Sequence, residues 1–130
     1  MSSLFDNSIG VLSKALDMHL LRHSVISDNI ANAETPGFRA RRVDFEAELQ
    51  RAVDAGATAG EEGVFRELAS ASPIVSEQLN SGKGIDQNTV DMDREMAAMT
   101  KNDVKYSSDT QMINKKFALL RYAISEGSDR

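Results

Sequence analysis

Apolar residues recur four and three residues apart along residues 3–32 of the chain. This is the a/d spacing of a coiled-coil helix, because it places the apolar side chains on one face that packs against a partner helix. No proline interrupts the segment, so the pattern predicts one long helix. The predicted contact face, named the N-terminal seam, consists of Ile9, Leu12, Leu16, His19, His23, Ile26 and Ile30.

The same spacing returns over residues 92–124. Asp91 is a suitable N-cap, and the acids that follow it favour the positive end of the helix dipole. The predicted contact face, named the C-terminal seam, consists of Met96, Met99, Tyr106, Ile113, Phe117, Leu120 and Ile124. The two seams predict paired helices, and the shorter return path favours an antiparallel hairpin with Leu12 near Leu120.

Pro36 and Gly37 stand where the first seam stops. Proline cannot continue a helix and pushes the residue before it into an extended conformation, so the helix is expected to end at residues 32–33. Pro-Gly is typical of a type II turn, in which glycine supplies a positive φ at the third position. Asn29 and Asn32 lie on the last helical face, where amides can bond to freed carbonyl groups or to a neighbouring chain.

The segment between the two helices is mixed in character. Asp44 is a candidate N-cap for a short helix ending near Val53, and residues 55–84 are rich in glycine, alanine and serine, which predicts an irregular connector. The fold class is therefore all-α, an antiparallel coiled-coil hairpin with a short helix and a long irregular connector. Residues 1–35 and 88–127 form a discontinuous helical domain, and residues 36–87 hold the turn, the short helix and the connector.

Composition excludes several classes of function. The chain has 130 residues, a net charge of −5 and no cysteine, so thiolate chemistry is excluded and nucleic acid is not expected as a partner. Apolar runs are too short for a membrane span, and the N-terminus lacks the pattern of a cleaved signal peptide. His19 and His23 have a zinc-like spacing, but two ligands are too few, and a polar pair within the seam is the expected role. No catalytic, cofactor-binding or metal site is predicted.

The sequence Asn29-Ile-Ala-Asn-Ala-Glu-Thr-Pro-Gly-Phe38 resembles the N-terminal signature of the bacterial flagellar rod, hook and hook-associated proteins. Its continuation through residue 45 is similar to a basal-body rod protein within that family, although Arg42 stands where an acid is usual. A second match covers residues 88–96, and the resemblance extends over about residues 1–50 and 85–125. The matched motif residues are Asn29, Asn32, Thr35, Pro36, Gly37, Phe38, Ala40, Asp44 and Phe45.

The resemblance implies a structural subunit of the proximal rod, the periplasm-crossing drive shaft that transmits torque, and not an enzyme. It implies export through the flagellar type III apparatus without a cleaved signal peptide. The implied partners are copies of the chain, other rod proteins, the MS ring, the rod-base adaptor and the export gate. The alternative is another exported helical hairpin, such as a type III secretion needle subunit or a secreted heterodimer.

Overall fold

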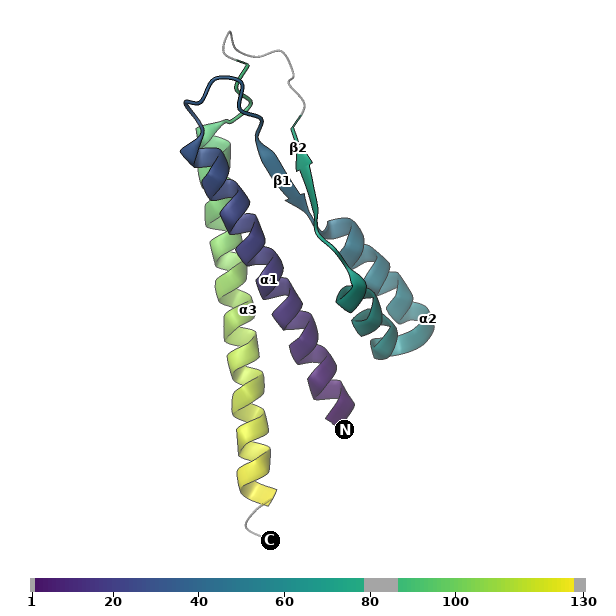
Figure 1. The fold of residues 1–130 in the computed structure, drawn as a ribbon. Coiled ribbons are helices and arrows are strands. Elements are labelled where there is room, and N and C mark those ends of the chain that lie inside the picture. The colour runs from purple at the N-terminus through teal and green to yellow at the C-terminus, as the bar shows by residue number, and fades with distance from the viewer. Residues whose placement is uncertain (1, 79–86, 128–130) are drawn as a thin grey trace.

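The computed structural model describes residues 2–78 and 87–127. Two long helices, α1 (Ser2–Ala31) and α3 (Met92–Gly127), lie side by side (Figure 1). Between them in sequence are a strand β1 (Arg41–Asp44), a helical segment α2 (Glu46–Ser70) and a strand β2 (Ile74–Glu77). Figure 1 shows this middle segment as a second lobe beside α1. Residues 79–86, which belong to the predicted connector, lie outside the described residues.

The antiparallel pairing of α1 and α3 is confirmed. Asn29, near the end of α1, bonds to Glu95 at the start of α3, and His19 bonds to Asn102 further along α3. The predicted register is wrong by about one heptad. Ala15 and Asp109 line one cavity, so the middle of α1 lies against the middle of α3, and not against its last turns.

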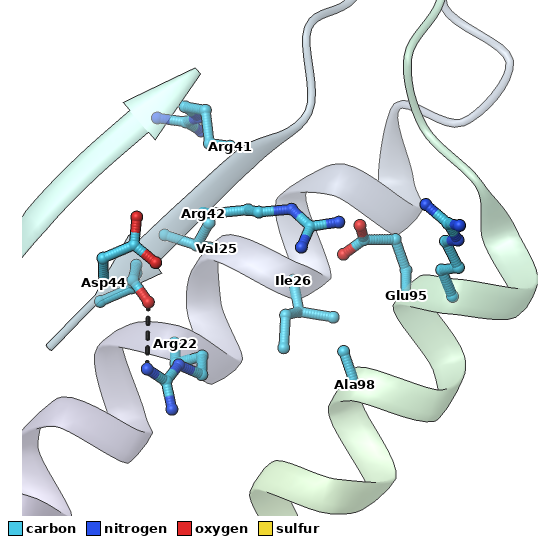
Figure 2. A pocket seen from close by; sticks show the side chains of 10 residues that line it. Arg22, Val25, Ile26, Arg41, Arg42, Asp44, Glu95 and Ala98 are labelled. Carbon is cyan, nitrogen blue, oxygen red and sulfur yellow. Dashed lines mark hydrogen bonds between the residues drawn. The ribbon is translucent and has the colours of Figure 1, made fainter. Parts of the chain in front are cut away.

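The observed register can be checked by disulfide cross-linking, since the chain has no cysteine of its own. Ile26 and Ala98 approach each other across the two helices (Figure 2). We expect Ile26→Cys and Ala98→Cys to form a disulfide within one chain under mild oxidation. Ile26→Cys with Asp109→Cys is the matched control, because Asp109 lies three turns further along α3, roughly 16 Å at about 1.5 Å per residue, beyond the reach of a disulfide. Linkage of the control pair alone would contradict this register.

The helix that follows β1 is longer than predicted. It reaches Ser70 and is interrupted at Gly60, whose φ of 66° and ψ of −159° lie outside the helical region. Figure 1 shows the chain reversing at this point, so that α2 consists of two short arms side by side. The prediction of an irregular connector from residue 55 is therefore wrong as far as Ser70. Alanine is the best helix former, and glycine marks the turn between the arms rather than a loop.

The two strands were not predicted. They pair antiparallel, with Arg41 opposite Glu77 and Asp44 opposite Ile74. Asp44 is consequently the last residue of β1. Its predicted role as a helix N-cap is wrong. Phe45 takes the N-cap position and makes no side-chain capping bond. A run of four residues with alternating exposure is too short to be distinguished from a helix start by periodicity.

The apolar core lies between α1, β1 and α2. Met18 and Val25 of α1 are buried together with Val43 of β1 and Leu68 of α2. Met18 and Val25 belong to a row beside the N-terminal seam, so the middle segment covers the side of α1 that α3 leaves open. In the N-terminal half of α1, Gly10 is in direct contact with Phe65 of α2. A Cβ added at Gly10 would come within 2.4 Å of the Phe65 ring. Gly10 thus serves a close contact between α1 and α2.

Candidate functional site

The turn that ends α1 has the predicted geometry. The Phe38 amide donates to the Thr35 carbonyl oxygen at 3.2 Å, and Gly37 has a φ of 72°. The α-helix ends at Ala31 and continues as turn, close to the predicted end. Thr35, Pro36 and Gly37 are exposed. The turn therefore forms one tip of the helical hairpin and is open to contact from outside.

Asn88, which lies shortly before α3, holds this turn in place. Its Nδ2 lies 3.0, 2.8 and 2.8 Å from the carbonyl oxygens of Asn32, Ala33 and Thr35, and its Oδ1 accepts from the Val90 amide at 2.8 Å. A helix leaves its last carbonyl groups without partners inside the helix. One asparagine side chain supplies the missing donor here.

Thr89 adds two bonds at the same place. Its amide donates to the Phe38 carbonyl oxygen at 3.1 Å, and its Oγ1 accepts from the Ala40 amide at 2.8 Å. Ala40 is fully buried, and Phe38 is half-buried. The two segments that carry the family resemblance are thus hydrogen-bonded to each other, and we name Asn88, Thr89 and the turn 32–38 the hinge clasp.

Asn29, like Ala40 among the predicted motif residues, has no exposed surface. Its Nδ2 donates to the Arg41 carbonyl oxygen at 2.8 Å and to Glu95 Oε2 at 3.0 Å. Its Oδ1 accepts from the Arg41 amide at 2.9 Å. One amide side chain therefore joins α1, β1 and α3, and it satisfies the buried carboxylate of Glu95.

The outer edge of β1 is closed by α1. Asn29 bonds both backbone groups of Arg41, and Arg22 donates to the Val43 carbonyl oxygen at 3.0 Å. An unpaired strand edge invites pairing with another chain. Side chains of α1 stand here in the place of a neighbouring strand. Asn32, in contrast, bonds locally to the Asp28 carbonyl oxygen and accepts from Thr35.

The two seam histidines face polar groups of α3. His19 Nδ1 lies 2.9 Å from Asn102 Oδ1, and His19 Nε2 lies 3.4 Å from Asp109 Oδ2. The side chain of His23 is 47% exposed and lies 3.2 Å from Asp103 Oδ1. His19 therefore occupies the seam as predicted, whereas His23 lies at its open edge. Within residues 2–78 and 87–127 no cluster of three or more His, Cys, Asp or Glu could hold a metal ion.

The contact face of α3 is rotated from the predicted C-terminal seam. The side chains at heptad spacing that meet α1 are Glu95, Asn102 and Asp109, and the first two are buried. Met99, Ile113 and Leu120 are half-buried, whereas Met96, Tyr106, Phe117 and Ile124 are exposed. On α1, Ile26 is buried, and Ile9, Leu12, Leu16 and Ile30 are half-buried. A polar row thus faces the partner helix, and much of the apolar surface of α3 faces outward.

This outward surface of α3 is extensive. Nine of its large apolar side chains are exposed, and they are Met92, Met96, Val104, Tyr106, Met112, Phe117, Leu119, Tyr122 and Ile124. Exposed apolar surface on this scale is typical of a protein that buries it against other chains. No helix in the described part of the chain is long and apolar enough to span a membrane.

Several residues of the site were not singled out from the sequence. Asn88 and Thr89 fall in the second family match, but their role at the hinge depends on hydrogen bonds to residues 32–40, which lie far earlier in the sequence. The sequence alone assigns Glu95 only a role at the positive end of the helix dipole, and it assigns none to Asn102. The available signal was the heptad spacing of polar residues 95, 102 and 109, which marks a row of its own.

A groove opens next to the hinge clasp, between α1, β1 and α3. It has a volume of about 470 Å³ and is lined by Arg22, Val25, Ile26, Arg41, Arg42, Val43, Asp44, Arg94, Glu95 and Ala98. Figure 2 shows Arg42 extending over it toward Glu95, with Ile26 and Ala98 at its base. The groove therefore combines an apolar floor with a charged wall.

Comparison with known proteins agrees with the geometry. The family model described as "Flagella basal body rod protein" matches residues 11–39, which cover most of α1 and the turn. Over 133 residues the chain is 31% identical to the flagellar basal body rod protein FlgB of Yersinia enterocolitica, covering 94% of the chain and 96% of the relative. The corresponding protein of Proteus mirabilis (strain HI4320) is 32% identical with the same coverage. That of Cereibacter sphaeroides is 33% identical, over 92% of the chain and 95% of the relative. The chain therefore belongs to the FlgB family of flagellar basal body rod proteins.

Proposed function

We propose that the chain is a structural subunit of the proximal rod, and that it packs with copies of itself and with other rod proteins into a tube. The family is one of structural rod proteins and not of enzymes. The observation that carries the proposal is the outward apolar surface of α3, with nine exposed large side chains along one helix. A chain that pairs its helices through a polar row and leaves its apolar surface outside requires neighbours.

The finer features of the proposal extend to location and partners. The subunits are exported through the flagellar type III apparatus, and the rod that they form crosses the periplasm. At its base the rod joins the MS ring, the rod-base adaptor and the export gate. The full-length similarity to rod proteins supports these features. It also disfavours the needle subunit and the secreted heterodimer, because the similarity includes the hinge as well as both helices.

The proposal can be tested in a bacterial strain that lacks its own copy of this rod protein. The chain should be recovered in purified basal bodies and should restore swimming. Phe117→Glu is expected to reduce the amount of chain in basal bodies about tenfold, since burying a Phe side chain contributes about 1.5–3 kcal/mol. The helix content of the free chain should not change, because Phe117 is 51% exposed in the single chain.

Lys115→Glu provides a matched control, since Lys115 is exposed on the same turn of α3 and adds no apolar surface. It should be incorporated nearly as well as the original chain. Recovery of the unmodified chain in the cytoplasm alone would refute the proposed function. Equal incorporation of the Phe117 and Lys115 variants would refute the role of the outward surface.

A further inference from the structure

The groove beside the hinge clasp carries more positive than negative groups. Four arginines and two acids line it, a surplus of two positive charges, and Val25, Ile26, Val43 and Ala98 form its apolar part. The carboxylate of Glu95 is buried and already accepts a bond from Asn29. The groove therefore presents guanidinium groups to whatever enters it.

Arg42 is the guanidinium best placed to bind an incoming group. Arg41 pairs with Asp28 at 2.9 Å and Arg94 with Asp91 at 3.7 Å, and both acids lie outside the groove. Such exposed pairs contribute about 0–1 kcal/mol and exchange readily. Arg42 is exposed and makes no ion pair with any residue of the described part of the chain. A carboxylate entering the groove would therefore pair with Arg42 without displacing an acid already bound to it.

The matching negative charge is concentrated in α2. Residues 46–70 contain six acids and two arginines, a net charge of −4 out of −5 for the whole chain. Asp54 and Glu62 are exposed, one on each side of the reversal at Gly60. Complementary charge of this kind steers association and selects the partner surface. The chain thus carries both halves of an ionic contact.

The two halves cannot meet within one subunit. Helix α2 begins directly after β1 and runs away from the groove toward the N-terminal half of α1, where Phe65 packs on Gly10 (Figure 1). The groove lies at the other end of α1, around Val25 and Ile26. An acidic side chain of α2 that fills the groove must therefore belong to α2 of another chain.

From this complementarity we propose that the groove of one copy binds the exposed acidic side chains of α2 from the next copy. The contact joins two different surfaces, so each subunit can give α2 to one neighbour and receive it from another. Head-to-tail contacts of this kind produce rings or open helical assemblies rather than two-fold symmetric dimers. The inference rests on the proposed function, because it names one contact by which rod subunits join.

Charge exchange tests the contact in basal bodies from the complemented strain. Arg42→Glu should reduce incorporation about tenfold, and Asp54→Arg with Glu62→Arg should do the same, because each places like charges together. Combining all three changes in one chain should restore incorporation to within about twofold of the original, since the pair is then reversed rather than removed. Arg39→Glu is the matched control, because Arg39 lies three residues from Arg42, is exposed and does not line the groove.

Cross-linking identifies the occupant directly. With Arg42→Cys in one chain and Glu62→Cys or Asp54→Cys in another, oxidation of basal bodies should give a disulfide between two copies. Three results would each overturn the inference. They are incorporation of the Arg42→Glu variant at the level of the original chain, failure of the triple variant to recover, and linkage of the Arg42→Cys variant to a different rod protein. If the unmodified chain enters the rod in these experiments, such results leave the proposed function standing.

Discussion

Asn29→Ala is expected to lower the free energy of unfolding by about 3–5 kcal/mol. The change removes the donor to the buried Glu95 carboxylate and leaves the amide and carbonyl of Arg41 without their partners. Each buried polar group left unsatisfied costs about 1–3 kcal/mol, and a charged group costs more. A loss of this size removes much of the stability of a small domain. Urea unfolding followed by circular dichroism measures it.

Two further variants isolate the cause. Asn29→Asp keeps an acceptor for the Arg41 amide but places a second carboxylate beside Glu95, so we expect a loss similar to that of alanine. Asn32→Ala is the matched control, because Asn32 lies one helical turn after Asn29 and its side chain bonds only to nearby residues. It should cost less than about 1 kcal/mol. If Asn29→Ala and Asn32→Ala lower the free energy of unfolding equally, the buried network of Asn29 contributes no more than a local side-chain bond.

Replacing Pro36 and Gly37 together by alanine is expected to abolish incorporation into the rod. Without proline, α1 can continue, and its new turn would draw the carbonyl groups of residues 32–35 into helical bonds. Asn88 would then lose the three acceptors that hold it. Alanine at position 37 would also resist the observed φ of 72°, at a cost of about 1–2 kcal/mol. Recovery of the variant in basal bodies and a swimming assay measure the effect.

Gly37→Asn with Pro36 retained is the control for the hinge. Asparagine tolerates the left-handed conformation better than other side chains, and an added Cβ would meet no atom within 4 Å. This variant should swim nearly normally. Normal assembly of the double alanine variant would mean that the turn does not direct the subunit into the rod.

The two long helices and their antiparallel order were predictable, because seam spacing, proline and N-cap signals all lie in local sequence. Asp91 caps α3 through its side chain to the Arg94 amide at 3.2 Å, as expected from the sequence. The length of α2 was not predictable in the same way. Its alanines favour helix and its glycines favour turns, and only the packing of two arms against α1 decides between them.

The contact face of α3 shows a second limit of prediction from sequence. Periodicity selected the apolar row that includes the half-buried Met99, Ile113 and Leu120, and it passed over the polar row that meets α1. Glu95 and Asn102 can be buried because Asn29 and His19 meet them with matched donors and acceptors. Such a match depends on residues 66 and 83 positions away, which no local pattern contains.

The hinge clasp has a consequence for how this chain can vary. The Ala40 amide and Thr89 Oγ1 lie 2.8 Å apart, so the two ends of the middle segment are fastened together at the tip of the hairpin where α1 ends and α3 begins. A segment whose entry and exit points are adjacent can lengthen, shorten or be exchanged without displacing what it is attached to. In this chain β1 and α2 stay tied to α1 through Asn29, Arg22 and the contact of Phe65 with Gly10, so only the parts of the middle segment that do not pack on α1 have this freedom.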